Sequence, residues 1–157
     1  MTLRYVYGQD RAVAHFVAQL IPHVDRGFPS DAKAIGITNA NNEPLAGIVF
    51  YFWNQKAGTT EVAIAGRTGT RWFSRETIFR LYDYAFTTRA CQMVIVRARA
   101  DNRSLLRQLD TFGYSFAPIA RLYGRNDDGV ICTYTAEQWN ESRFNRPPPQ
   151  PQQEKAA

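Results

Sequence analysis

The spacing of hydrophobic residues switches along the chain between a period of two and a period of about 3.6. The first is typical of strands with one buried face, and the second of amphipathic helices. Strands are predicted over residues 2–8, 33–39, 45–55, 60–66, 91–100, 114–125 and 130–136. Helices are predicted over residues 11–21, across the apolar stripe of residues 78–86, and over 101–113. One α+β (α/β) domain with about seven strands is therefore expected.

Residues that favour helix ends accompany these patterns. The candidate N-caps are Asp10 for the first helix, Ser74 or Thr70 for the second, and Asp101 or Asn102 for the third. Gly113 is expected to end the third helix, because glycine readily adopts the left-handed conformation found there. The last residues are rich in proline and glutamine, so we expect a folded domain over residues 1–143 and a disordered tail over 144–157.

Composition narrows the class of protein without deciding its function. Of 157 residues, 45% are hydrophobic, which is enough for a proper core. No apolar run is long enough to span a membrane, and Cys91 and Cys132 lack metal-ligand spacing. Buried thiols, no metal and a cytoplasmic location are expected. The net charge of +5 includes sixteen arginines against three lysines, which permits a phosphorylated ligand or nucleic acid but indicates neither.

The stretch DNRSLLRQLDTFGYSFAPIARLYGR combines an Asn-x-Ser helix start, a glycine–aromatic helix end and a strand carrying an arginine. The positions concerned are Asn102, Ser104, Gly113, Tyr114 and Arg121. With the order of elements, this pattern resembles the GNAT superfamily of acyl-CoA-dependent N-acyltransferases over residues 2–139. Its Asn-x-Ser form is most similar to the branch that acetylates ribosomal-protein N-termini. The resemblance implies a mixed, mostly antiparallel sheet, flanked by helices and splayed between its fourth and fifth strands.

The turn GRTGTRW after the fourth predicted strand is a candidate phosphate site. In the superfamily, a turn of the form Gln/Arg-x-x-Gly-x-Gly/Ala holds the pyrophosphate of coenzyme A on backbone N–H groups and the helix behind it. The resemblance makes Arg67, Thr68, Gly69, Thr70, Arg71 and Arg75 candidate coenzyme ligands. Gly66 and Arg71 depart from the pattern. Arg71 either turns outward and pairs with a phosphate, or crowds the site; a solvated basic turn is the alternative.

Acyl transfer to an amine needs a base, and the resemblance points to Glu61. Many members carry a glutamate on the fourth strand that acts through water, and Glu61 begins that strand. Such a base accelerates the reaction roughly 10²–10⁴-fold. The alternative is that Glu61 is a solvent-exposed residue at the start of a strand. The resemblance also makes Val96 and Asn102 coenzyme contacts, and Ser104 a group that orients the coenzyme sulfur.

The proton donor for the leaving thiolate is less clear from the sequence. Many members carry a tyrosine where this chain has Leu109, and leucine cannot donate a proton. The candidate substitutes are Tyr82, Tyr84, Tyr114 and Tyr123, although tyrosines at such spacings usually belong to a core.

Four other polar residues are candidates for recognising a ligand. Arg97 and Arg99 share one face of the fifth predicted strand, so both point toward a cleft, where they would recognise an anionic substrate or the coenzyme, or toward solvent. His15 and His23 lie in or beside the first helix, which in the superfamily forms part of the acceptor side.

Three classes of function remain open. The first, which we prefer, is transfer from acetyl-CoA or another acyl-CoA to a primary amine of a small molecule or peptide, by direct attack in a ternary complex. The second, favoured by Leu109 and the altered turn, is a degenerate relative that binds coenzyme or a partner without turnover. The third is a nucleic-acid-associated protein, supported only by basic charge. No membrane association is expected, and exposed strand edges make a homodimer reasonable.

Overall fold

The computed structural model of the chain describes residues 2–149 and is built on one seven-stranded sheet. The strands are β1 (Arg4–Val6), β2 (Lys33–Thr38), β3 (Pro44–Asn54), β4 (Thr59–Gly66), β5 (Met93–Arg99), β6 (Ser115–Gly124) and β7 (Asp127–Thr135). Their order in space is β1-β2-β3-β4-β5-β7-β6. Strands β4 and β5 are parallel and the other neighbours antiparallel. The predicted mixed, mostly antiparallel sheet is confirmed.

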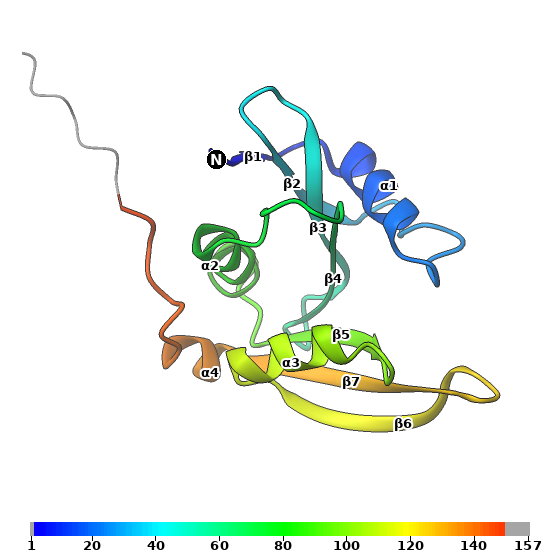
Figure 1. Cartoon of the computed structure of the whole chain (residues 1–157). Coiled ribbons are helices and arrows are strands. Elements are labelled where there is room, and N and C mark those ends of the chain that lie inside the picture. The colour runs from blue at the N-terminus through cyan, green and yellow to red at the C-terminus, as the bar shows by residue number, and fades with distance from the viewer. Residues whose placement is uncertain (1, 150–157) are drawn as a thin grey trace, which may run out of the picture.

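Helices cover both faces of the first half of this sheet. They are α1 (Asp10–Leu20), α2 (Arg75–Asp83) with a π-helical continuation η1 (Tyr84–Thr88), α3 (Arg103–Phe112) and α4 (Ala136–Asn140). Figure 1 shows α1 on one side of β3 and β4 and α2 on the other. Helix α3 packs on the α2 side, because its Leu109 and Phe112 belong to the same hydrophobic core as Leu81 and Tyr82.

Helix α1 lies close to the sheet because a glycine leaves room for it. A Cβ on Gly47 of β3 would stand 2.6 Å from Val17 and 2.7 Å from Val13, both on the apolar stripe of α1. Val17 is fully buried as a result. The predicted cap of this helix is wrong: Asp10 is the first helical residue rather than the N-cap. Its carboxylate instead accepts a hydrogen bond from the backbone N–H of Ala34 at 2.8 Å, which ties α1 to β2.

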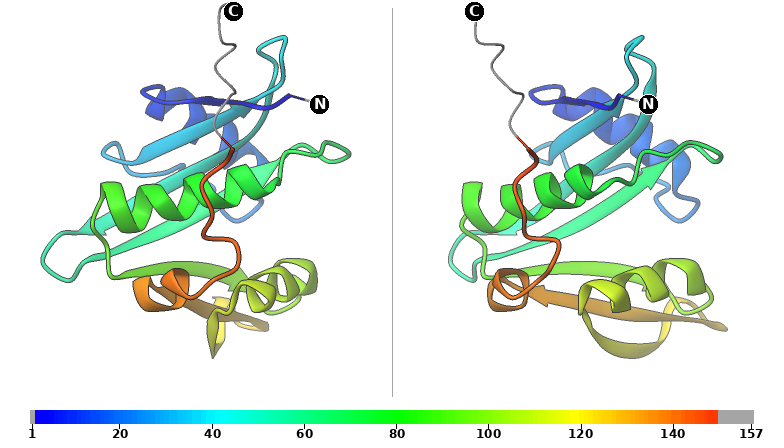
Figure 2. Two further views of the ribbon diagram at one scale, coloured as in Figure 1. Left: turned by 90° about the vertical axis from the view of Figure 1, so that its left-hand side faces the viewer. Right: turned by 60° about the vertical axis from the view of Figure 1, so that its left-hand side comes forward.

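Strands β4 and β5 are paired at one end only. The parallel register runs from Thr59 opposite Met93 to Glu61 opposite Ile95, and no further pair follows. Beyond this point β4 continues to Gly66 and β5 to Arg99, and the two strands diverge (Figure 2). The expected splay between the fourth and fifth strands is therefore present, and it opens the sheet between its two halves.

The end of the described chain packs onto the domain. Helix α4, which the hydrophobic pattern does not predict, begins with a capping box in which Thr135 and Gln138 bond to each other's backbone. Phe144, which the sequence assigned to the tail, stacks edge-on against Phe112 at 5.1 Å, so packing continues past the expected boundary at residue 143. The predicted tail from residue 150 onward lies outside the described residues.

Candidate active site

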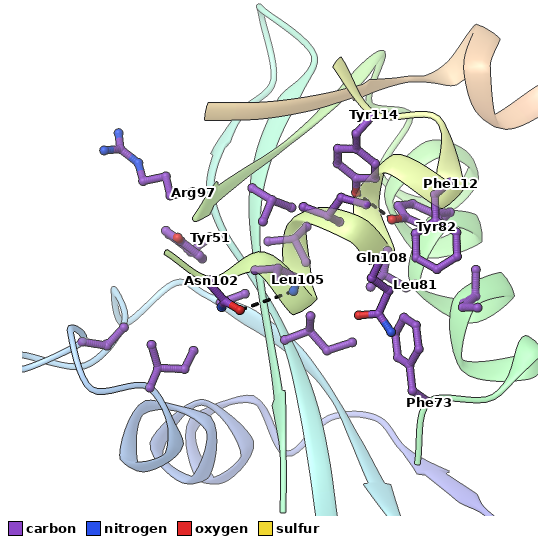
Figure 3. A pocket seen from close by; sticks show the side chains of 18 of the residues that line it. Tyr51, Phe73, Leu81, Tyr82, Arg97, Asn102, Leu105, Gln108, Phe112 and Tyr114 are labelled. Atoms are coloured by element: carbon purple, nitrogen blue, oxygen red, sulfur yellow. Dashed lines mark hydrogen bonds between the residues drawn. The ribbon is translucent and has the colours of Figure 1, made fainter. Parts of the chain in front are cut away.

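A cavity of about 190 Å³ occupies the gap between β4 and β5. Side chains of α2 and α3 form its wall on one side of the sheet, and the loop after α1 borders it on the other. Figure 3 shows the lining side chains, with Tyr82 and Tyr114 at one end and Tyr51 and Arg97 at the other. The cavity therefore connects the two faces of the sheet through the place where the strands part.

The middle of the cavity is apolar because each bordering strand turns its inward-facing residues into it. Val62 and Ile64 come from β4, Val96 from β5, and Leu109 from α3. The predicted coenzyme contact Val96 thus lines the cavity. Leu109 is only 5% exposed, so the position that often holds a proton-donating tyrosine is part of the apolar wall.

A pair of tyrosines occupies the inner end. The hydroxyls of Tyr82 and Tyr114 lie 2.6 Å apart and satisfy each other's hydrogen-bonding needs. Burial raises the pKa of Tyr82 far above its usual value, and burial together with the neighbouring Tyr82 does the same to the pKa of Tyr114. Both hydroxyls therefore stay protonated, and the pair forms a fixed structural contact of the cavity floor.

A charged cluster lies at the outer end. Both carboxylate oxygens of Glu61 accept hydrogen bonds from the Nε of Arg97, at 3.2 and 3.3 Å. The Glu61 side chain is only 12% exposed, whereas that of Arg97 is 46% exposed. Tyr51 stands directly opposite Glu61 in the β3–β4 register. Burial, followed by the charge of Glu61, raises the pKa of Tyr51 well above its usual value. Glu61 is thus a buried carboxylate held by an ion pair, and the reading of an exposed strand-start residue is wrong.

Tyr123 of β6 reaches this cluster from the far edge of the sheet. Its ring crosses β7 at Gly129, where a Cβ would stand only 2.9 Å from it. The ring then contacts His23 in the loop after α1, with centroids 4.8 Å apart. The hydroxyl of Tyr123 is buried and has no hydrogen-bond partner among the described residues. Tyr123 and Arg97 line the same cavity, and Arg97 is paired with Glu61. Burial raises the pKa of Tyr123, the charge of Arg97 lowers it, and the charge of Glu61 raises it.

The candidate phosphate turn lies beside the cavity rather than in its lining. Arg67, Thr68, Gly69 and Arg71 are exposed, and Gly69 has a positive φ of 80°. The Thr70 hydroxyl donates to the carbonyl of Arg67 at 2.7 Å and closes the turn. Arg75 lies on the first turn of α2, with its guanidinium 5.7 Å from the Phe144 ring. Arg71 is exposed and lies outside the cavity lining.

Two features explain how this turn departs from the expected pattern. The indole of Trp72 lies directly on Gly66, and any Cβ there would overlap it. Only glycine fits, so the Gln or Arg of the pattern has no room. Helix α2 then starts at Arg75, and the hydroxyl of its N-cap Ser74 accepts the backbone N–H of Thr77 at 3.1 Å. Of the two predicted caps, Ser74 is confirmed, while Thr70 belongs to the turn.

The other predicted residues divide into those at the cavity and those away from it. Asn102 caps α3 through Leu105 N and lines the cavity, whereas Ser104 is exposed on the first turn of α3 and does not. Arg99 is held by Asp101 and Asp127, and His15 is bonded to Gln19 on the surface of α1. Among the described residues, no group of three or more metal-binding side chains is assembled.

Sequence reasoning missed several residues of the site, of which three carry polar or aromatic side chains of interest: Tyr51, Phe73 and Gln108. Tyr51 could have been found, because alternation in a β-hairpin places residues that are opposite each other on the same face. Phe73 and Gln108 line the cavity from the segment before α2 and from α3, and no local pattern distinguishes them from other aromatic or polar residues.

Comparisons with known proteins identify the fold. No protein-family model and no curated protein sequence matches this chain. Among solved structures, spermidine/spermine N-acetyltransferase SpeG from Vibrio cholerae aligns with a TM-score of 0.69 and 14% identity, over 88% of this chain and 94% of that one. A dodecameric structure of spermidine N-acetyltransferase from the same organism aligns with a TM-score of 0.69 and 14% identity, over 89% of this chain and 96% of that one. A chimera of V. cholerae SpeG and hSSAT aligns with a TM-score of 0.71 and 13% identity, over 89% of this chain and 99% of that one.

At such low identity the likeness concerns the fold alone. The chain has the GNAT fold, a single domain with a mixed seven-stranded sheet flanked by helices, as the sequence resemblance implied. These structures do not bear on the ribosomal-protein branch, which stays a prediction. In the described part of the chain, no helix has the length and apolarity needed to cross a membrane.

Proposed function

We propose that the protein is an N-acyltransferase that moves an acyl group, most simply acetyl, from acyl-CoA to a primary amine. One observation carries the proposal: an apolar cavity passes through the gap between β4 and β5, and Arg97 in its lining holds the buried carboxylate of Glu61. An acyl thioester needs an apolar channel, and an amine needs a base at its end. The GNAT-fold structures that resemble this chain are N-acetyltransferases, which supports the same reaction class.

The residues at the gap fit an acyl-CoA. Backbone groups of β4 beyond Glu61 have no partner strand on the β5 side, so they are available to the amides of a pantetheine chain. The adjoining turn offers Arg67, Arg71 and Arg75, and none of these forms an ion pair within the described residues. Guanidinium groups and backbone N–H groups of a tight turn suit phosphates. We assign the coenzyme phosphates to this turn, and the predicted ligand Asn102 to the cavity beside it.

Bound coenzyme supplies the activated acyl group, and the protein supplies the base. Glu61, directly or through water, takes the proton that the attacking amine must lose. Transfer forms one carbon–nitrogen bond and breaks one carbon–sulfur bond, and the proton lost by the amine balances the one gained by the released thiol. Leu109 cannot donate that proton. A role for Ser104 remains a prediction, since its side chain lies outside the cavity lining.

The resemblance to the ribosomal-protein branch would make a peptide N-terminus the acceptor, and a small-molecule amine is the other choice. Two free, buried cysteines suit a reducing compartment, so a cytoplasmic location belongs to the proposal.

A homodimer is also proposed, because the edge strand β6 leaves Phe116 38% exposed and Ile119 41% exposed. Sedimentation velocity, with Ile119→Lys as the disrupting variant, tests that point.

A coenzyme-binding protein without turnover is the second candidate. It is favoured by the Glu61–Arg97 ion pair, which occupies the expected base, and by the apolar Leu109. Such a protein would be stabilised by coenzyme A and would release no thiol with any amine. Nucleic-acid binding has only the basic charge in its favour, and retention on arbitrary duplex DNA that falls steeply with salt would be its signature.

Thermal unfolding with acetyl-CoA, coenzyme A and desulfo-coenzyme A tests the proposal first. A ligand at 100 times its dissociation constant adds about 2.7 kcal/mol to the free energy of unfolding. Thiol release over a panel of amines then separates an enzyme from a binding protein.

Glu61→Gln keeps an oxygen for the Arg97 Nε but removes the base, so we expect kcat to fall roughly 10²–10⁴-fold with coenzyme affinity retained. The matched control, Glu141→Gln on the exposed end of α4, should leave both unchanged. Absence of any stabilisation by coenzyme contradicts the proposal.

A further inference from the structure

The outer end of the cavity is rich in hydrogen-bond donors that lack partners. Arg97 uses only its Nε for Glu61, and no hydrogen bond within the described residues engages its two terminal nitrogens. The hydroxyl of Tyr123, which lines the same cavity, is buried and has no hydrogen-bond partner among the described residues either. An unpaired buried hydroxyl is costly in the free protein, so its retention points to a ligand atom that accepts from it.

Both members of the Glu61–Arg97 ion pair have hydrogen-bonding capacity left for a ligand. Because Nε holds the carboxylate, the outer fork of the guanidinium remains open for a second carboxylate, which it can bind through two parallel hydrogen bonds. Glu61 retains room for an ammonium, since the Arg97 Nε and the neighbouring Tyr51 hydroxyl together do not use all the lone pairs of two oxygens. A ligand with an amine and a carboxylate a few bonds apart would complete an alternating row of four charges.

Charge balance limits which amines suit this site. Glu61 and Arg97 sum to zero, and Arg99 nearby is neutralised by Asp101 and Asp127. Burial and then the charge of Arg99 lower the pKa of His23, which favours its neutral form. A zwitterion leaves the sum at zero, whereas a polyamine would bring two or three positive charges to a cavity in which, among the described residues, the one ionised lining side chain is the cation Arg97.

We propose that the acceptor is an amino carboxylate, an amine that carries its own carboxylate close by as an α-amino acid does. Glu61 receives the amino group, and the terminal nitrogens of Arg97 with the Tyr123 hydroxyl hold the carboxylate. This assignment rests on the proposed acyl transfer for its chemistry but concerns binding. Arg97 and Tyr123 are specificity-determining residues in this scheme, and Glu61 is shared with the reaction.

The experiment compares α-amino acids having apolar, aromatic and cationic side chains with the amines that result from their decarboxylation. The pairs include phenylalanine with phenethylamine and ornithine with putrescine; spermidine and a peptide with a free N-terminus are added. Binding to the protein, alone and with coenzyme A, is measured by calorimetry, and kcat/KM by thiol release. A charge-assisted pair predicts that the best amino acid exceeds its decarboxylated partner by roughly 10–100-fold in both.

Variants separate recognition from catalysis. Arg97→Gln should remove most of the preference, which is measured as the ratio of kcat/KM, and of binding constants, between each amino acid and its decarboxylated partner. Because Arg97 also holds Glu61, any effect on the base acts on both members of a pair and cancels in that ratio. Tyr123→Phe should reduce the preference to a smaller extent. The matched control is Arg107→Gln, an exposed arginine on α3, which should retain the parental ratio. Unfolding temperature, measured for each variant, identifies any that are misfolded.

The outcomes are distinguishable from failure of the acyl transfer. If no thiol is released with any amine, calorimetry still decides the ligand class, because it needs no turnover. Equal or tighter binding of decarboxylated amines, tighter binding of spermidine or of the peptide, a preference that survives Arg97→Gln, or no binding of any amino carboxylate would each overturn the inference.

Discussion

Removing the hydroxyl of Tyr82 or Tyr114 provides a quantitative test of the cavity floor. The two residues are 3% and 6% exposed, and their hydroxyls are 2.6 Å apart, so each hydroxyl is the other's buried hydrogen-bond partner. Tyr82→Phe leaves the Tyr114 hydroxyl buried and unpaired, and Tyr114→Phe does the reverse. Each single change should cost about 1–3 kcal/mol of unfolding free energy.

The double variant should cost much less than the sum. With both hydroxyls gone, two phenyl rings of nearly the same shape remain, and replacing both partners by apolar groups is close to neutral. We expect the double variant within about 1 kcal/mol of the parent, against about 2–6 kcal/mol if the effects simply added. Urea unfolding, with m-values compared to confirm an unchanged transition, measures all three variants.

Tyr123→Phe is the matched control, because its buried hydroxyl has no partner within the described residues. Its removal should leave the stability of the ligand-free protein unchanged or slightly higher. Additive losses at Tyr82 and Tyr114, or a loss at Tyr123 as large as theirs, would show that the hydroxyls bond to groups other than those seen here, and the account of the cavity would fail.

Three further outcomes follow from the turn and the thiols. Gly66→Ala forces the Trp72 indole off the turn, so we expect a loss of about 1–3 kcal/mol, shifted tryptophan fluorescence and weakened coenzyme binding; an unshifted spectrum contradicts this packing. Ser74→Ala removes the N-cap of α2 and should cost about 0.5–2 kcal/mol in urea unfolding, whereas Ser74→Asp should recover most of it. Burial raises the pKa of Cys132 to about 11 and raises that of Cys91, so at pH 8 both thiols should react slowly with Ellman's reagent until the protein is unfolded, when two thiols appear. Fast reaction of the native protein would contradict that burial.

Local patterns sufficed for much of the fold because they depend on neighbours in the chain. Alternation located the strands, and Ser74, Asn102 and Gly113 marked helix ends as predicted, since capping is a contact between residues two or three apart. Asp10 failed because a residue 24 positions away, Ala34, competes for its carboxylate. Such competition leaves no trace in the spacing of the first helix.

The candidate site was predicted in part for a related reason. Glu61 and Val96 were assigned from their strands, and both lie at the gap: Val96 lines the cavity, and Glu61, where β4 and β5 part, is paired with the lining residue Arg97. The sequence also placed Arg97 and Arg99 on one face of a strand, but it did not distinguish which of them faces the cleft. Only the tertiary structure separates them, because Arg97 meets Glu61 whereas Arg99 meets Asp101 and Asp127.

The sequence by itself determined the order of elements, the strand faces and the resemblance to the GNAT fold, all of which follow from periodicity and short-range motifs. The tertiary structure alone decided which distant side chains converge: β4 and β5 part after Glu61, and Tyr123 crosses β7 to reach the opening. The physical reason is that strand periodicity fixes the face on which a residue lies, but register and splay between remote strands depend on the packing of the whole core.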